Sequence, residues 1–335
     1  MDNKSSIGTQ TECNEIDRLK STQDKSTQVN MDEEEELIKG KTIKKENIKK
    51  LVFGGGFLKG YCLCGSIKYL FEHNLIKNIN TLIGSSAGAL CALILSLNYN
   101  MKEIEELIIS FDFNKYENIT LENMMNFMEN FGFDNGEKFS QVIKNFIYKK
   151  TNNCYITFEQ LYNLNKKTLI VSGTNLDKNK TEYFSHLTTP DMPVWLAIRI
   201  STSYPFFYNI VEYNNNKYID GAASSNCSIE VIEDLLDNNL DDTLCITLNN
   251  FEIFENNDDN KTKSIKKEVS YNLYNYFIDL TSSLRYRDII RMKKYTYNLL
   301  SIQGNFSSYK EKIEKEEILN LIEHGYKQTK AFFTD

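Results

Sequence analysis

The sequence has few of the residues from which metal centres and histidine-dependent sites are built. Its 335 residues include three histidines, His73, His186 and His324, and seven cysteines without a repeated Cys-x-x-Cys pair. Ligands at zinc-binding spacing are therefore missing. The odd number of cysteines favours free thiols over a disulfide framework. We assign no metal and expect no cofactor.

Long apolar runs and an excess of basic residues are also missing. The longest apolar stretch, around 87–97, is far shorter than the roughly 20 residues of a membrane-spanning helix. The first residues do not start a secretory signal. The chain has 39 Lys and Arg against 46 Asp and Glu, which argues against nucleic-acid binding. We expect an intracellular protein, either soluble or peripherally bound to a membrane.

The first 48 residues are polar, with an acidic run at 32–36 followed by a lysine-rich stretch. Such a segment buries too little apolar surface to offset the entropy of ordering it, so residues 1–48 are predicted to be a disordered arm. The pairs Thr9-Gln10, Thr22-Gln23 and Thr27-Gln28 resemble the linear motifs that dynein light chain hubs bind by strand addition. Chance repetition in a polar tail is the alternative.

A serine between glycines is the central motif of the remaining chain. Residues 84–88 read Gly-Ser-Ser-Ala-Gly, after the apolar pair Leu82-Ile83 and before a helix-like run at 89–95. In such a strand–turn–helix elbow the flanking glycines allow close approach, and the strained turn exposes the central hydroxyl. Ser86 is therefore the candidate nucleophile. Small residues also cluster in ordinary strand-to-helix loops, so the motif needs support from elsewhere.

Three glycines at 54–56 follow a short apolar strand at 50–53. A dinucleotide fingerprint would need glycine where Lys59 stands, and a phosphate loop would need a lysine after Gly60. Both nucleotide motifs are thus excluded. What remains is a row of backbone N–H groups able to hold an oxyanion. The candidate donors are those of Gly54, Gly55, Gly56 and Phe57.

These motifs occur in an order that resembles the patatin-like phospholipases. The run 55–60 reads Gly-Gly-Phe-Leu-Lys-Gly, segment 84–88 follows, and Asp220-Gly221-Ala222 comes after a strand-like stretch at 217–219. Segments 157–176 and 197–207 are also similar, so the resemblance covers about residues 50–250. The residues that support the match are Lys59, Gly60, Gly84, Gly88, Gly221 and Ala222. Phe57 departs from the pattern, because a third glycine is usual there.

The resemblance implies a three-layer α/β/α fold with a mostly parallel sheet, and a metal-independent lipid acyl hydrolase. It implies that Ser86 attacks an ester carbonyl while Asp220 accepts the serine proton, with an acyl-enzyme intermediate. Two alternatives stay open. One is a histidine-based triad hydrolase, for which His324 is the only candidate in chain order. The other is a catalytically silent scaffold that binds a membrane or a partner.

The other segments are predicted to be mostly helical. The apolar group between Met124 and Phe133 is expected to be core, with a lipid-facing lid as the alternative. A helix at 228–237 and a strand at 244–248 should extend the sheet. We predict helices at 263–303 and 310–333; a basic cluster from Arg285 to Lys294 is either a solvated face or a contact with anionic lipid.

The predicted domains follow from these readings. They are the arm at 1–48, a catalytic domain at 49–250, and a helical C-terminal extension at 251–335 that packs on the catalytic domain.

Overall fold

The fold is described by a computed structural model, which covers residues 47–110, 118, 120–249, 299–304 and 313–334. The Thr-Gln pairs, the rest of the predicted arm up to residue 46, and the basic cluster from Arg285 to Lys294 lie outside these residues.

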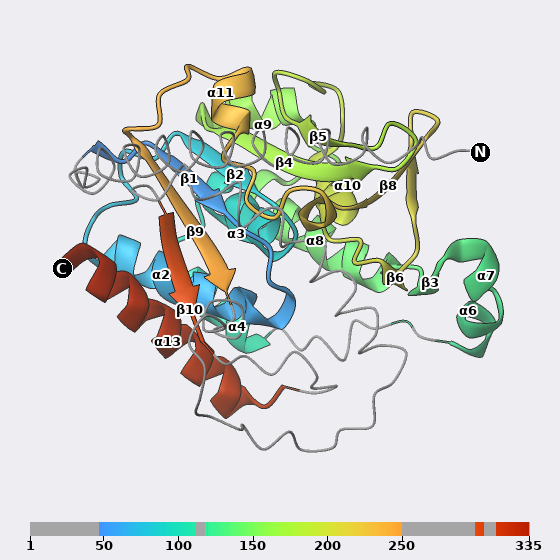
Figure 1. The fold of residues 1–335 in the computed structure, drawn as a ribbon, viewed down its shortest axis with the longest axis horizontal. Helices are drawn as coiled ribbons and strands as arrows, with labels where there is room; N and C mark the ends of the chain where they lie inside the picture. The colour runs from blue at the N-terminus through green and yellow to red at the C-terminus, as the bar shows by residue number, and fades with distance from the viewer. Residues whose placement is uncertain (1–46, 111–117, 119, 250–298, 305–312, 335) are drawn as a thin grey trace, which may run out of the picture. The chain divides into compact units, whose positions relative to one another are not determined.

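A mostly parallel sheet forms the centre of the fold (Figure 1). The pairs β10–β9, β9–β1, β1–β2 and β2–β4 are parallel, whereas β8 pairs antiparallel with β4 and with β7, and β5 pairs antiparallel with β4. In sheet order the strands are β10 (Leu299–Gln303), β9 (Thr243–Asn249), β1 (Lys50–Phe53), β2 (Thr81–Gly84), β4 (Thr168–Asn175), β8 (Asn216–Asp220) and β7 (Val211–Tyr213), with β5 (Lys180–Phe184) beside β4.

Helices connect these strands. They are α2 (Gly60–Glu72), α3 (Ala87–Ser96), α4 (Met101–Ser110), α6 (Leu121–Met125), α7 (Phe127–Asn130), α8 (Glu137–Thr151), α9 (Phe158–Asn165), α10 (Val194–Ser201), α11 (Val231–Leu235) and α13 (Lys315–Thr334). A small second sheet pairs β3 (Gly132–Asp134) with β6 (Phe206–Tyr208). No helix within the described ranges has both the length and the apolarity needed to cross a bilayer.

Successive side chains of a strand point to opposite faces of the sheet, and in the central sheet both faces are buried. Leu51 and Phe53 of β1 belong to the larger core, with α2, α3 and α10. Val52 belongs to a smaller core with Ile83 and the segment 227–232, which includes part of α11. Figure 1 shows α11 on one side of the sheet and α2 with α13 on the other. The predicted three-layer α/β/α fold is confirmed.

The C-terminal region differs in part from the predicted helices. Residues 299–303 form β10, an edge strand parallel to β9, and not the end of a helix. Their sequence, Leu-Leu-Ser-Ile-Gln, is a short apolar run, and such runs do not distinguish strand from helix by periodicity. The closing helix is present as α13, and residues 263–298 lie outside the described chain.

Helix α13 packs directly against α2. The two backbones touch where each helix carries a glycine: a Cβ on Gly65 would collide with the Ile322 carbonyl, and one on Gly325 with the Cys62 carbonyl. Close by, the Thr329 hydroxyl donates to Ser66 Oγ at 2.8 Å. The described part of the C-terminal region is therefore held by the sheet and by α2.

Two sequence expectations about side chains are wrong. Cys227 and Cys245 are joined by a disulfide, with their Cα atoms 7.5 Å apart, although we expected free thiols; Cys62, Cys64, Cys91 and Cys154 are free.

The apolar group between Met124 and Phe133 is only partly packed. Phe127 and Phe133 stack at 4.4 Å, but Met125, Met128 and Phe131 are exposed. Alternation of apolar residues locates a face, but it does not say whether another element covers it.

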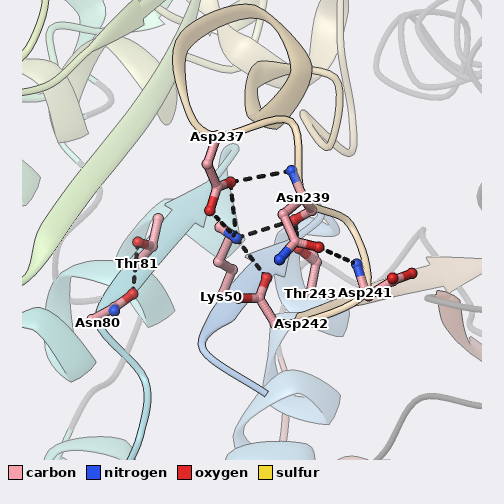
Figure 2. Close-up of polar contacts among 8 residues, drawn as sticks. All are labelled: Lys50, Asn80, Thr81, Asp237, Asn239, Asp241, Asp242 and Thr243. Atoms are coloured by element: carbon pink, nitrogen blue, oxygen red, sulfur yellow. Dashed lines mark hydrogen bonds and ion pairs between the residues drawn. The ribbon is translucent and has the colours of Figure 1, made fainter. Parts of the chain in front are cut away.

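A buried lysine links the start of β1 to the loop before β9 (Figure 2). Lys50, the first residue of β1, donates from Nζ to Asp242 Oδ1, to Asp237 Oδ2 at 3.1 Å and to the Asn239 carbonyl at 3.1 Å. All three acceptors lie between α11 and β9. The lysine thus ties the start of β1 to the loop that leads into β9.

Candidate active site

Ser86 occupies a strained turn between β2 and α3. Its φ of 54° and ψ of -125° place it in a region that costs a non-glycine residue roughly 1–3 kcal/mol. The flanking glycines are required by close approach. A Cβ on Gly84 would strike the first turn of α3 at Ala89, and one on Gly88 would strike the carbonyl of Phe53 in β1. The elbow predicted from the sequence is therefore present, with the serine at its tip.

Asp220 lies within hydrogen-bonding distance of this serine. Ser86 Oγ donates to Asp220 Oδ2 at 2.7 Å, and the other carboxylate oxygen, Oδ1, accepts from the Ala222 N–H at 2.8 Å. Only 9% of Ser86 and 2% of Asp220 are exposed. In these buried surroundings a charge-assisted hydrogen bond is stronger than in water. The two residues are thus held in one geometry.

The strand that carries Asp220 runs against the direction of its neighbour. β8 pairs with only the last part of β4, with Tyr218 opposite Asn175 and Asp220 opposite Gly173. On the other side of β4, Gly84 at the end of β2 lies opposite Val171. The end of the antiparallel strand thus lies two residues along β4 from the level where β2 ends. That overlap brings the aspartate to the serine.

The end of α10 anchors both residues through their backbones. The Ser86 N–H donates to Ser201 Oγ at 3.0 Å, and the Asp220 N–H donates to the Ser203 carbonyl at 3.0 Å. Arg199 in the same helix donates to Ser203 Oγ, and burial lowers the pKa of its guanidinium. The sequence reasoning assigned no role to these residues. Their only signal was the similarity of segment 197–207 to the family.

The glycine loop after β1 lies directly beside Ser86. A Cβ on Gly55 would lie 2.8 Å from Ser86 Cβ, so only glycine leaves the serine its room. The Gly54 N–H donates to the Ile246 carbonyl at 2.9 Å, and the Gly55 N–H donates to the Asn226 carbonyl at 3.2 Å. Two of the predicted oxyanion donors are therefore engaged within the protein.

Two amides near the serine remain as donors. Among the residues that the structure describes, neither the Gly56 N–H nor the Ala87 N–H has a protein acceptor. Ala87 is the first residue of α3, where backbone N–H groups have no partner within the helix and the helix dipole is positive. The sequence analysis named donors only in the glycine loop. Gly56 belongs to the glycine loop, and Ala87 directly follows Ser86 in the elbow.

The backbone at Phe57 adopts a conformation that favours glycine, the usual residue at this position. Its φ of 50° lies in the left-handed region, which glycine adopts without a penalty from a Cβ. The phenylalanine side chain projects into the site, with its ring centroid 6.0 Å from that of Tyr204. The residue therefore keeps the backbone path of the loop while adding bulk beside Ser86.

An apolar cavity of about 160 Å³ opens next to the serine and the aspartate. Its walls come from the glycine loop, from α2, α3, α4 and α8, and from the segment 202–208. The side chains that give it its apolar character include Leu90, Ile94, Leu107, Phe139, Ile143 and Phe146. Such a cavity suits a hydrocarbon chain better than a charged group.

None of the three histidines lines this cavity. The His73 ring stacks on Tyr69, and His186 stacks on Tyr162, each at 3.9 Å. His324 Nε2 contacts the Gln303 carbonyl at 2.7 Å. Within the described ranges no group of three or more His, Cys, Asp or Glu side chains is arranged to hold a metal ion.

The fold and the site define an α/β protein with a strained serine at a strand–helix elbow and an aspartate that accepts a hydrogen bond from this serine. The sequence pattern of the family described as patatin-like phospholipase matches residues 51–232, which is more than half of the chain. The chain belongs to this family. Membership supports lipid acyl hydrolase activity.

Similar proteins come from viruses and bacteria. Uncharacterized protein R571 of Acanthamoeba polyphaga mimivirus is 29% identical over 296 residues, covering 87% of this chain and 95% of its own. Probable lipid hydrolase 463L of Invertebrate iridescent virus 6 is 30% identical over 195 residues, covering 57% of this chain and 65% of its own. The crystal structure of VipD from Legionella pneumophila shares the fold, with a TM-score of 0.57, 19% identity and coverage of 85% of this chain and 66% of that one.

Proposed function

We propose that this protein is a metal-independent hydrolase that cleaves carboxylic ester bonds of phospholipids or related acyl lipids. The observation that carries the proposal is the 2.7 Å hydrogen bond from Ser86 Oγ to Asp220 Oδ2 beside an apolar cavity. A serine hydroxyl needs a base before it becomes a strong nucleophile, and in this proposal the Asp220 carboxylate is that base. The relative named probable lipid hydrolase 463L supports the same class of substrate.

The reaction would proceed through an acyl-enzyme. Asp220 Oδ2 accepts the proton of Ser86 as its Oγ attacks the ester carbonyl, and the protonated carboxyl then donates this proton to the departing alcohol. In the second half, Asp220 takes a proton from water, water oxygen attacks the acyl carbon, and the serine regains its proton. The bond between serine and acyl group breaks, and a fatty acid leaves.

The tetrahedral oxyanion needs hydrogen-bond donors that are already in place. We assign this role first to the Gly56 N–H and the Ala87 N–H, which have no protein acceptor within the described chain. The Phe57 N–H stays a candidate from the sequence. Gly54 and Gly55 would each have to give up a hydrogen bond to a carbonyl before donating, so we assign them to shaping the loop.

The central test is fatty-acid release from mixed phospholipid vesicles by the wild type and by Ser86→Ala. Release by the wild type and its loss in the variant are expected, because the variant has no nucleophile. Ser85→Ala is the matched control, since Ser85 lies in the same motif but its Oγ donates to the Ser225 carbonyl. A fluorophosphonate probe should label the wild type and Ser85→Ala at Ser86.

Two outcomes would sink this proposal. If the folded wild type neither releases fatty acid nor reacts with the probe, the protein is the catalytically silent scaffold that the sequence left open. If release depends strictly on added Ca²⁺ and stops with a chelator, the metal-independent chemistry is wrong.

Phe57→Gly should broaden the range of esters that are cleaved. The exchange keeps the left-handed backbone, which glycine adopts freely, and removes the ring that lies beside Tyr204 at the cavity. We expect kcat/KM for esters with bulky acyl groups to rise several-fold, on the order of what 1 kcal/mol allows, relative to short esters. Paired kinetics on a short and a branched ester measure this. An unchanged ratio would show that the ring does not limit access.

A further inference from the structure

Four exposed apolar side chains lie within eleven residues on α6, α7 and the residue after them. Leu121 is 80% exposed, Met125 83%, Met128 78% and Phe131 51%. We call these four residues the α6–α7 patch. Other exposed large apolar side chains in the described chain are spread over different segments, at Tyr148, Tyr155, Leu164, Leu176, Leu187 and Leu319. Single exposed apolar residues are normal on a protein surface, whereas four so close together in the chain make this segment a candidate interaction site.

The α6–α7 patch is joined to the catalytic cavity through two short strands. After α7 the chain enters β3, which lies beside β6 (Figure 1). In this pair Asp134 lies opposite Tyr208. Tyr208 lines the cavity, and so does Tyr204 just before β6. Beyond β3 the chain continues into α8, whose Phe139 and Ile143 form another part of the cavity wall. The patch thus borders the segment that encloses the proposed acyl site.

The charge around the α6–α7 patch excludes strongly anionic surfaces as its binding partner. Glu122 and Glu129 are both exposed, and no Lys or Arg occurs between residues 121 and 137. An acidic surface is repelled by anionic lipid headgroups and by nucleic acid. Leucine, phenylalanine and the flexible thioethers of Met125 and Met128 are suited to entering the boundary between headgroups and acyl chains. Attraction should therefore come from apolar contact, not from charge.

We propose that the α6–α7 patch docks the protein on a zwitterionic phospholipid bilayer and presents the cavity to its lipids. The proposal rests on the proposed function, since a bilayer is the surface that holds the substrate. It differs from the sequence-based alternative of the basic cluster Arg285 to Lys294, which requires anionic lipid and weakens in salt. The side chains of the patch enter the apolar layer, and the two glutamates stay in water.

The test is binding of full-length Ser86→Ala to phosphatidylcholine vesicles, measured by flotation at low and at high salt. Binding that changes little with salt is expected. Each apolar side chain that enters the lipid contributes about tenfold to partitioning, so changing Leu121, Met125 and Met128 together to serine should weaken binding about a hundredfold or more. The matched control changes Leu164, Leu187 and Leu319, three exposed leucines on other segments, to serine. The control should bind like its parent.

Three results would overturn the docking proposal. The first is equal vesicle binding by the patch variant and the control, with both folded. The second is binding only to vesicles that contain anionic lipid, lost at high salt, which points to the basic cluster instead. The third is no vesicle binding together with a dimer that the patch variant abolishes, which makes a second copy of the chain the occupant.

These experiments distinguish a failure of the docking proposal from a failure of the proposed function. Vesicle binding is measured on Ser86→Ala and needs no turnover. Hydrolysis of a soluble ester by the wild type needs no bilayer. A protein that cleaves the soluble ester but ignores phosphatidylcholine vesicles refutes docking alone, and one that binds without cleaving refutes the proposed function alone.

Discussion

Asp220→Asn should lower kcat for a soluble ester by about 10²- to 10⁴-fold, the contribution of a positioned general base. Asparagine has the same size, and its amide oxygen can still accept the hydrogen bond from the Ala222 N–H. Its backbone should stay in place, because the Asp220 N–H donates to Ser203 and the Asp220 carbonyl accepts from Thr174 Oγ1 at 2.8 Å. Only the capacity to accept the proton of Ser86 is lost.

The informative control for this variant is His324→Ala. His324 is half-buried, its Nε2 contacts the Gln303 carbonyl on β10, and it does not line the cavity beside Ser86, so its replacement should leave kcat nearly unchanged. Steady-state kinetics on both variants, with thermal melting to verify the fold, separate a Ser–Asp pair from a histidine-based triad. Full activity in Asp220→Asn together with loss in His324→Ala would require the triad.

Lys50→Met should lower the free energy of unfolding by about 3–5 kcal/mol, the usual cost of removing one partner of a buried ion pair. Methionine fills much of the space of the lysine stem but leaves the carboxylates of Asp242 and Asp237 without their cation (Figure 2). Typical domains have only about 5–15 kcal/mol of stability, so the loss is large. Urea unfolding of the variant measures it.

Lys49→Met is the matched control. Lys49 is the adjacent residue, and both lysines border a polar cavity of about 420 Å³, but the side chain of Lys49 is exposed. An exposed charge of this kind contributes little, so the control should unfold close to the wild type. Equal unfolding midpoints for Lys50→Met and Lys49→Met would show that the buried contacts of Lys50 add no stability.

The effect of Lys50→Met should shrink on acidification. Partial burial would by itself raise the pKa of Asp237, but the hydrogen bonds from Lys50 and the Asn239 amide outweigh it and lower that pKa below its ordinary 3.8. A carboxylate with a lowered folded-state pKa adds stability above its unfolded pKa, and this is lost as pH falls through the folded value. The difference between the unfolding curves of the wild type and the variant should therefore narrow as the pH falls below 3.8, by the part that Asp237 contributes. Divergence would contradict the assignment.

Short-range features of the fold could be predicted from the sequence because they depend on local sterics. The elbow at Ser86 requires Gly84 and Gly88, since any Cβ there would strike backbone, and this requirement is visible in the spacing. The strands β1, β2 and β9 likewise follow from apolar runs bounded by turns. Asp220 could be placed at the end of a strand for the same reason.

Features that depend on tertiary register could not be predicted. Nothing local to residues 216–220 says that β8 is antiparallel or that it overlaps only the end of β4, yet this overlap brings Asp220 to Ser86. The hydrogen bond between Ser201 and the Ser86 backbone depends on where α10 packs in the fold. The exposure of Met125 depends on which elements cover α6, and a run of apolar residues carries no information about that.

The backbones of Ser86 and Asp220 are both attached to the end of α10. This attachment should make the proposed proton transfer less sensitive to small movements than the proposed oxyanion binding. Because Ser201 and Ser203 lie within one turn of chain, a displacement of that turn should move Ser86 and Asp220 together. The distance between Ser86 Oγ and Asp220 Oδ2 should therefore change little when the molecule fluctuates. Of the two proposed oxyanion donors, Ala87 follows Ser86 directly, whereas the loop that carries Gly56 is also attached through Gly54 to Ile246 of β9. Gradual loosening on warming should therefore weaken the contribution of the Gly56 donor before it weakens proton transfer.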